Sequence, residues 1–372
     1  MAESLYTDEL VDAVRLALVS GVGPRHRQDL LAQFGSTAAV LAASVHHLQE
    51  VNGIGPKIAA RIAAAHSEID AEAELALAAE HGIDVLTEAD DAYPRTLRQI
   101  HDPPGVLFRR GTFTPQDELA IAIVGTRHAT RYGLMQAERL AGSLARVGFT
   151  IVSGLARGID AAAHHGALES GGRTIAVLGS GLLNIYPPEH ERLADDVAAS
   201  GCLMSEAPPR MVPLSGAFPQ RNRIISGLAV GTIVVEAANR SGALITARHA
   251  YEQGREVFAV PGPIDSRLSQ GCHALIKDGA KLVETIDDVL AELGPLAEHI
   301  TREDGSIVAQ PAELLLNEVE QQVLQAIDCQ PISLDAVASA CELPIHRVLS
   351  TVSVLEMRRL VRRVSGTQVV RA

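Results

Sequence analysis

The stretch AFPQRNRIISGLAVGTIVVEAANRSGALITARHAYEQGREVFAVPG, residues 217–262, decides the fold of this chain. Its apolar, β-branched runs Thr232–Val235 and Glu256–Val260 predict two strands. Between them the turn Asn239–Gly242 leads into a helical pattern over Ala243–Gln253. A right-handed strand–helix–strand crossover places such a turn at the carboxyl end of a parallel sheet, which is where ligands bind in folds of this kind.

The same alternation of strand and helix extends to both sides of this stretch. Further strands are expected at Leu119–Val124, Thr150–Val152, Thr174–Leu178, Leu203–Ser205 and Lys281–Val283, after a short strand at Val106–Phe108. Helical patterns separate them, at Tyr132–Arg146, Gly158–Glu169, Glu189–Ala199 and Ile286–Leu293. Strands joined through single helices predict an α/β fold, a Rossmann-like doubly wound parallel sheet.

The residues before this sheet are expected to form a small helical domain over 1–85. Within it, VNGIGPKIAARIAA (51–64) looks like a helix-hairpin-helix motif, in which two glycines permit a tight turn beside a helix start. Lys57 and Arg61 could support a phosphate contact there. A turn used for packing alone is the favoured alternative, because residues 1–90 carry 5 basic and 14 acidic side chains.

The chain after the sheet predicts a linker and a third domain. The sheet domain is assigned to 86–295, the polar linker to 296–312 and a winged-helix-like domain to 313–372. The last contains helical patterns at Glu313–Ile327, Ser333–Ala340 and Pro344–Arg358, then strands at Val361–Val364 and Gln368–Val370 that turn at Ser365-Gly366. Duplex DNA and protein are equally plausible partners for this domain.

Composition limits the class of protein. The chain has no run of about 18 apolar residues and no basic, apolar leader, so neither membrane insertion nor a signal peptide is expected. Its four cysteines lack metal-ligand spacing and are interpreted as buried free thiols of a cytoplasmic protein. The net charge is −13, but residues 91–290 carry 20 basic and 20 acidic side chains, which leaves room for a local anion site.

Glycine, hydroxyl and arginine side chains recur where the predicted strands end. The segment Gly125-Thr126-Arg127 follows one strand, and Ser153-Gly154 with Arg157 follows the next. A loop holding Arg221-Asn222-Arg223 precedes a third. Backbone N–H groups at helix starts and arginine guanidinium groups both bind phosphate, so this edge predicts an anion site. Several arginines along one edge favour a single-stranded polynucleotide.

A catalytic interpretation of the same edge is weaker. Asp160 and His164 lie four residues apart at a helix start and so face the same side, but a helix-capping aspartate with a partly buried histidine is the favoured explanation. Glu236 is interpreted as a structural carboxylate. No metal site, nucleophile motif or cofactor signature is found, so no cofactor, metal or catalytic residue is expected.

Six motifs in order resemble the DNA-processing protein A family (DprA, also called Smf). They are VGTRHATRYG, VSGLARGIDAAAHHGAL, GGRTIAVLGSGLLNIYPPEH, FPQRNRIISGLA, VVEAANRSGALITARHAYEQGREVFAVPG and SQGCHALIKDGA. The resemblance implies a non-enzymatic protein that binds and protects incoming single-stranded DNA, forms homodimers and loads the RecA recombinase during natural transformation. The flanking helical and winged-helix regions also fit the layout of that family.

The resemblance also implies a set of nucleic-acid-binding residues. Matched position by position, they are Gly125, Thr126, Arg127, Gly154, Arg157, Arg221, Asn222 and Arg223. The chain departs from the pattern of the family at Thr126, where serine is commoner, and at Leu183, Ala243 and His273, where aspartate, serine and asparagine are usual. The last three departures put the fine polar lining of the pocket in doubt.

Two other functions remain open. One is a LOG-like nucleotide phosphoribohydrolase, which shares the Gly-Thr-x-x-Glu pattern seen at Gly231, Thr232 and Glu236. The PGGxGT signature of that family is missing, because Leu228-Ala229-Val230 replaces its glycines. The other is a scaffold that recruits RecA with incidental DNA contact.

Overall fold

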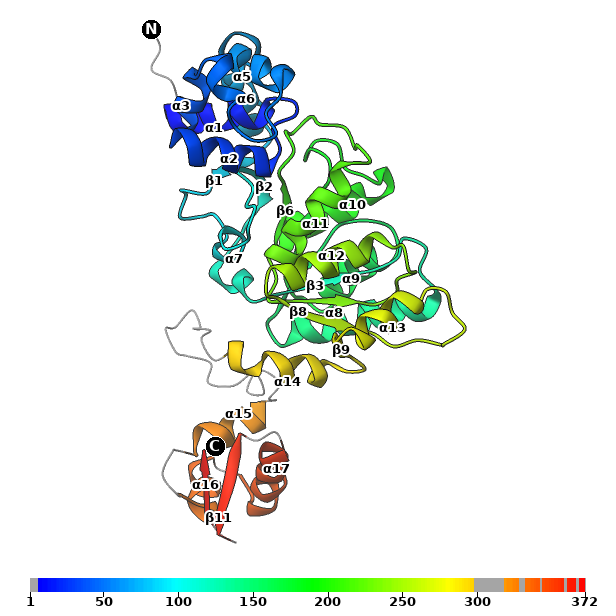
Figure 1. Ribbon diagram of the computed structural model, residues 1–372. Coiled ribbons are helices and arrows are strands. Elements are labelled where there is room, and N and C mark those ends of the chain that lie inside the picture. The colour runs from blue at the N-terminus through cyan, green and yellow to red at the C-terminus, as the bar shows by residue number, and fades with distance from the viewer. Residues whose placement is uncertain are drawn as a thin grey trace. The chain divides into compact units, whose positions relative to one another are not determined.

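The computed structural model describes residues 6–297, 318–327, 332–341, 343–357, 360–365 and 368–371 of the chain. The chain divides into two compact units. The first holds Met1–Ala145 and Phe149–Glu284, and the second holds Arg146–Gly148 and Thr285–Ala372. Figure 1 labels most of the elements of both units.

The first unit is built on a nine-stranded sheet. Its order is β1-β2-β6-β5-β4-β3-β7-β8-β9, and the seven strands from β6 to β9 run parallel while β1 and β2 are antiparallel. The strands are β1 Asp84–Thr87, β2 Val106–Gly111, β3 Ala120–Val124, β4 Thr150–Ser153, β5 Thr174–Val177, β6 Cys202–Ser205, β7 Gly231–Val234, β8 Glu256–Ala259 and β9 Lys281–Leu282. The doubly wound parallel sheet predicted from the sequence is confirmed, and each strand from β3 to β9 ends within one residue of its predicted bounds.

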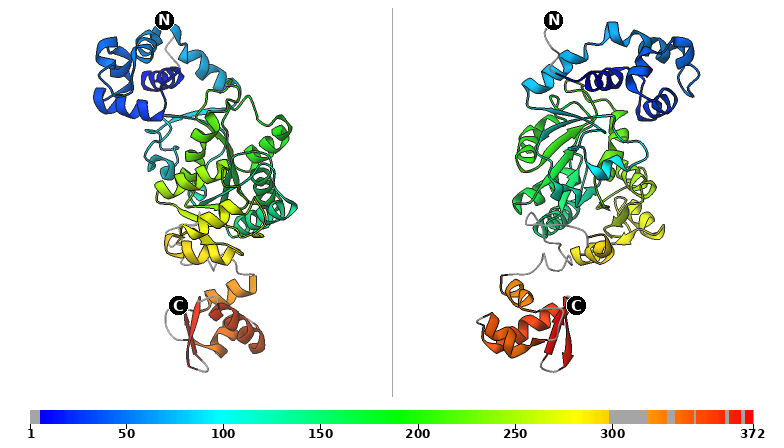
Figure 2. Two further views of the ribbon diagram at one scale, coloured as in Figure 1. Left: turned by 45° about the vertical axis from the view of Figure 1, so that its right-hand side comes forward. Right: turned by 90° about the vertical axis from the view of Figure 1, so that its left-hand side faces the viewer.

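The direction of winding changes beside β3. From β3 the chain moves outward through β4, β5 and β6, then returns to place β7 on the other side of β3. The helices that connect the strands lie on both faces of the sheet (Figure 2). They are α8 Arg131–Arg146, α9 Ile159–Glu169, α10 Glu191–Ser200, α11 Ala217–Gly227, α12 Gly242–Glu252 and α13 Gln270–Lys277. The carboxyl ends of β3 and β7 therefore form the switch point at which such folds bind ligands.

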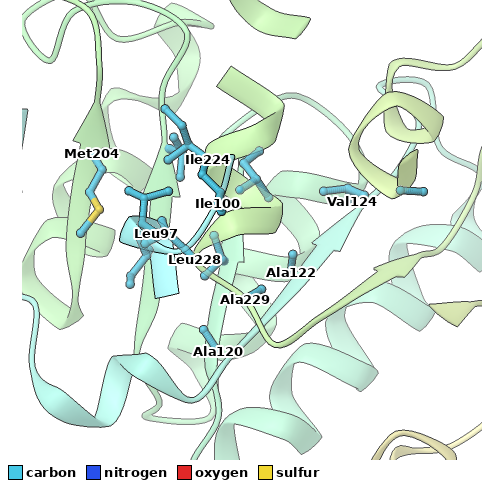
Figure 3. Close-up of a cluster of buried hydrophobic side chains, with 14 of the residues drawn as sticks. Leu97, Ile100, Ala120, Ala122, Val124, Met204, Ile224, Leu228 and Ala229 are labelled. Carbon is cyan, nitrogen blue, oxygen red and sulfur yellow. The ribbon is translucent and has the colours of Figure 1, made fainter. Parts of the chain in front are cut away.

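A hydrophobic cluster on one face of the sheet packs α11 against β3, beside the switch point. Ala120 and Ala122 of β3 present small side chains, and Ile224 and Leu228 from α11 and its end pack over them (Figure 3). Leu97, from the short helix α7 (Arg95–Arg98), joins the same cluster. A second cluster on the opposite face includes residues of α9 and α10 and of the helices α1 (Asp8–Leu18) and α6 (Ala71–Glu80).

Helix α11 corrects the sequence prediction, which placed Arg221-Asn222-Arg223 in a loop. The polar run PQRNR suggested solvent exposure, but Arg221 and Arg223 are both buried in the folded unit. Pro219 lies in the first turn of α11, where a helix tolerates proline because its missing N–H would have no partner there. The helix fixes the directions in which these three side chains point.

The residues before the sheet form the predicted helices. They are α1 Asp8–Leu18, α2 Pro24–Phe34, α3 Thr37–Ala42, α4 Val45–Leu48, α5 Pro56–Glu68 and α6 Ala71–Glu80. Gly21 and Gly53 adopt positive φ in the turns before α2 and α5, and the His26 ring covers Gly53. Strand β1, which the sequence analysis did not predict, pairs with β2 at the edge of the sheet.

The second unit contains α14 Ile286–Ala297 and a helix–sheet arrangement of its own. Helices α15 Glu318–Gln325, α16 Leu334–Ala340 and α17 Ile345–Met357 surround a sheet of order β10-β12-β11, made of Ile332–Ser333, Gln368–Arg371 and Val361–Ser365. The three helices and the strand pair match the winged-helix prediction within the described residues. The linker positions 298–312, residues 313–317, Arg358, Arg359 and Gly366 lie outside those residues.

Two compositional expectations can be compared with the described residues. Within those ranges no helix is long and apolar enough to cross a membrane. Cys202, Cys272 and Cys341 are buried free thiols, as expected, and Cys329 lies outside the described residues.

Candidate functional site

A cavity of about 740 Å³ opens at the switch point of the sheet. Its walls come from the loop after β3, from α11 and the chain before it, and from the first turns of α12. Five of the eight predicted binding residues line it, namely Gly125, Thr126, Arg127, Arg221 and Asn222. Asn222 also donates from Nδ2 to the Gly242 carbonyl at 3.2 Å, which ties α11 to the start of α12. The structure thus brings these five residues to one place.

The loop after β3 is held by bonds within the protein. Thr126 N donates to the Glu236 carbonyl at 2.7 Å, and His128 N donates to Thr126 Oγ1 at 3.2 Å. The Glu236 carboxylate accepts from Thr130 N at 2.9 Å and from Thr130 Oγ1 at 2.6 Å. Three N–H groups of the predicted anion cradle are therefore already engaged. Glu236 caps the start of α8, which supports the structural role predicted for its carboxylate.

Arg127 is the exposed cation of the cavity. Its guanidinium carbon lies 5.2 Å from the centre of the Phe218 ring, and the Phe218 and Tyr186 rings are 5.8 Å apart at a 49° angle. Within the described residues no carboxylate pairs with Arg127. The cavity therefore offers a positive charge without an ion-pair partner beside two aromatic rings.

Arg221 lies beneath this exposed layer. The residue is 6% exposed, and its Nη1 donates to the Gly154 carbonyl at 2.8 Å and to the Val177 carbonyl. Burial lowers the pKa of the guanidinium to about 10, so it remains charged at neutral pH. Gly154 does not line the cavity, but a Cβ there would lie 2.6 Å from the guanidinium nitrogens. Glycine at position 154 thus makes room for the arginine.

Arg157 and Arg223 do not line the cavity. Arg157 pairs with Glu189, which raises the pKa of the arginine and lowers the pKa of the glutamate. Arg223, in α11, has a buried side chain. Its Nη2 donates to both Glu206 carboxylate oxygens at 2.8 Å, and its Nε lies 3.1 Å from Asp102 Oδ2. Both guanidinium groups are already neutralised by carboxylates, unlike that of Arg127.

Asp160 and His164 lie on the same helix, α9, but only Asp160 lines the cavity. Asp160 lines the cavity, and its carboxylate accepts from Ala156 N at 3.4 Å at the start of α9. Burial raises the pKa of that carboxyl. His164 is fully buried away from the cavity, with Nδ1 2.7 Å from Thr174 Oγ1. Because Thr174 Oγ1 donates to the Ile151 carbonyl, the histidine donates from Nδ1 to the hydroxyl. These contacts support a structural role for His164.

His164 should make the folded chain sensitive to acid. Burial lowers its pKa from 6.5 to about 3, so the unfolded chain binds a proton that the folded chain excludes between these pH values. Stability should fall by about 1.4 kcal/mol per pH unit as the pH drops through this window. We expect urea unfolding of His164→Asn to lose this share of the pH dependence, whereas His165→Asn, at an exposed neighbour, should keep it. Equal slopes for the wild type and both variants would contradict this account.

The binding residues predicted from the sequence did not include several residues of the cavity wall. Tyr186 and Phe218 line the cavity, and so does Ser241, whose turn was predicted to lie at this edge. Ser241 Oγ accepts from Ala243 N as the cap of α12. The scarcity of aromatic residues argued against a broad stacking platform, yet two of the eleven Phe and Tyr residues meet at this one site. In the sequence, the one indication of their place was that each precedes a proline, Pro187 or Pro219, in a segment that connects predicted elements. No cluster of metal-ligating side chains occurs among the described residues.

Three regions of the chain match models of known protein families. Residues 84–294 match the family model of DNA recombination-mediator protein A. The chain belongs to this family. Residues 14–66 match a SAM-like helix-hairpin-helix tandem, and residues 308–367 match the DprA winged helix domain. The family predicted from the six motifs is confirmed.

Individual relatives support the same assignment. The chain is 35% identical to Protein Smf of Synechocystis sp. over 378 residues, which covers 94% of this chain and 95% of that protein. It is 46% identical to the DNA processing protein DprA of Bacillus subtilis over 220 residues, covering 59% and 74%.

Solved structures of the DNA recombination-mediator protein A family give the same result. The X-ray structure of DprA from Streptococcus pneumoniae matches with a TM-score of 0.66 and 37% identity, over 76% of this chain and 97% of that one. A Helicobacter pylori DNA processing protein A, solved for its single-stranded DNA binding mode, matches with a TM-score of 0.51 and 30% identity, over 57% and 95%.

The departures from the family pattern fall in and around the cavity. Ala243 lines it directly, where a serine hydroxyl would add a donor. Leu183 donates its backbone N–H to Pro209 in the chain that leads to α11, and His273 Nε2 lies 3.0 Å from the Gly262 carbonyl outside the cavity. Of these three, Ala243 alters the polar lining directly.

Proposed function

We propose that this chain binds single-stranded DNA in the cavity at the switch point. The observation that carries the proposal is the pairing there of the unneutralised Arg127 with the Phe218 and Tyr186 rings. The arginine can bind a phosphate of the strand, and the aromatic rings can stack against an unpaired base. The Helicobacter pylori relative described for its single-stranded DNA binding mode supports the same ligand.

The geometry favours a single strand over a duplex. Base–aromatic stacking requires a base that can leave its neighbours, and a duplex holds its bases inside the helix. Arg127 would then hold a phosphate while a neighbouring base lies against the rings. We assign direct contact to Gly125, Thr126, Arg127, Arg221 and Asn222. Gly154, Arg157 and Arg223 would support these residues from behind, since the two arginines are neutralised within the protein.

The wider role follows from the family. We propose that the chain is a non-enzymatic homodimer in the cytoplasm that protects incoming single strands during natural transformation and passes them to RecA. The domain boundaries at 85/86, 295/296 and 312/313 stay predictions. A LOG-like phosphoribohydrolase remains the alternative, and it would need a reaction centre at the same sheet edge.

A salt titration tests the proposed ligand. Fluorescence anisotropy should give tighter binding to a labelled oligo-dT than to a hairpin duplex of equal length. The logarithm of the affinity for the single strand should fall with log salt by about 0.7 for each phosphate contact. Binding that does not depend on salt, or that prefers the duplex, would contradict the proposal. Release of free base from a nucleoside monophosphate would support the phosphoribohydrolase.

A further inference from the structure

A buried acidic side chain and a buried basic one face the cavity without forming an ion pair. Asp160 is 7% exposed and Arg221 is 6% exposed, and both residues line the cavity. Their charges influence each other, yet no ion pair joins them among the residues that the structure describes. Buried charges in proteins are normally paired, since an isolated charge loses its hydration. A ligand that contacts both would supply further partners to the two groups.

The bonding groups of the two side chains define that ligand. Within the described residues, the hydrogen bonds of Arg221 use Nη1, which leaves Nη2 as a donor. The Asp160 carboxylate is an acceptor that already takes the backbone N–H groups of Ala156 and Gly154. A phosphate has acceptors alone at neutral pH, so it would suit Arg221 but be repelled by Asp160. The pair instead suits a group that carries a donor and an acceptor side by side.

The Watson–Crick edge of a nucleobase is such a group. Guanine offers two donors, N1–H and N2–H, to one carboxylate and the O6 acceptor to a guanidinium. Thymine, cytosine and adenine offer a single donor position beside an acceptor. The Phe218 and Tyr186 rings beside the same cavity supply the flat surfaces against which a base can stack.

We infer that Asp160 and Arg221 read the base edge of one nucleotide of the bound strand and that guanine fits them best. The inference rests on the proposed binding of single-stranded DNA and names the part of the strand that enters the cavity. Arg127 holds the phosphate at the rim, and the buried pair contacts the base below it.

A single-base comparison tests the inference without a protein variant. The full chain is titrated with labelled oligo-dT that carries one central dG, and then with the same oligomer carrying deoxyinosine, which lacks the 2-amino group. One lost hydrogen bond should weaken binding about fivefold. Equal affinity for the two oligomers overturns the inference and leaves the proposed function standing. If no oligomer binds, both fail.

The Asp160→Asn variant separates base reading from phosphate binding. An amide keeps the size of the side chain, and thermal unfolding checks that the variant folds. If Asp160 reads a base, Asp160→Asn should lose the preference for dG over deoxyinosine. If a phosphate occupies the same place, removal of the carboxylate should tighten binding to every oligomer alike and steepen the salt dependence. That second result, or a preference that survives in the variant, overturns the inference.

Discussion

Replacing Arg127 by alanine is expected to weaken binding of an oligo-dT by about tenfold to a hundredfold. Hydrogen bonds to charged groups contribute about 1.5–3 kcal/mol. Within the described residues no carboxylate forms an ion pair with Arg127, so its guanidinium is available to a phosphate. The salt dependence should become shallower by about 0.7, because one phosphate contact disappears. Anisotropy at several salt concentrations measures both effects. Because Arg127 is exposed, the free energy of unfolding should hardly change.

Arg248→Ala is the matched control for this variant. Arg248 is also an exposed arginine, but it lies farther along α12, where Nε bonds Glu252 Oε1 at 2.8 Å. It does not line the cavity. Its loss removes the same charge from the net charge of the chain, so affinity should change far less than in Arg127→Ala. Equal losses in the two variants would mean that DNA senses the overall charge of the surface, and the cavity would lose its assignment.

Short buried strands were the most predictable part of the fold. Runs such as Ala120–Val124 are apolar throughout because parallel strands are covered on both faces, and this pattern is visible in the sequence. Helix α11 was not visible in this way. Its core side includes Arg221 and Arg223, whose burial depends on carbonyls and carboxylates far along the chain, such as Val177 and Asp102. A search for apolar residues at helical spacing does not detect a helix whose buried side chains include charged ones.

The sequence predicted at which edge of the sheet the candidate site lies, but it did not predict which of the arginines line the cavity. Glycine and arginine at the strand ends marked the correct edge, since the fold brings these ends together. The sequence could not rank the arginines, because whether a guanidinium is free depends on partners brought close by folding. Arg157 meets Glu189 across 32 positions, while Arg127 meets an aromatic ring. The sequence analysis considered Asp160 only beside His164, because folding alone brings Asp160 into the same cavity as Arg221.

The buried ion-pair cluster behind α11 should dominate the stability of the first unit. The Arg223 side chain is 3% exposed, whereas its partners Glu206 and Asp102 are 30% and 34% exposed. Replacing Arg223 by methionine leaves two carboxylates near each other without the cation between them. Breaking a buried pair in this way costs about 3–5 kcal/mol, and the partial exposure of the acids favours the lower value. Urea unfolding at pH 7 measures the loss.

The pH dependence of that loss separates charge from packing. Burial raises the pKa of Glu206, and Arg223 opposes the rise, so the variant should raise this pKa further above its unfolded value. A carboxyl with a raised folded pKa destabilises the chain above that pKa and ceases to do so below the unfolded value of 4.5. The deficit of Arg223→Met should therefore shrink as the pH falls from 7 toward 4.5. A deficit that stays constant would assign the effect to lost packing, and Arg157→Met, which breaks an exposed pair, should show little change at either pH.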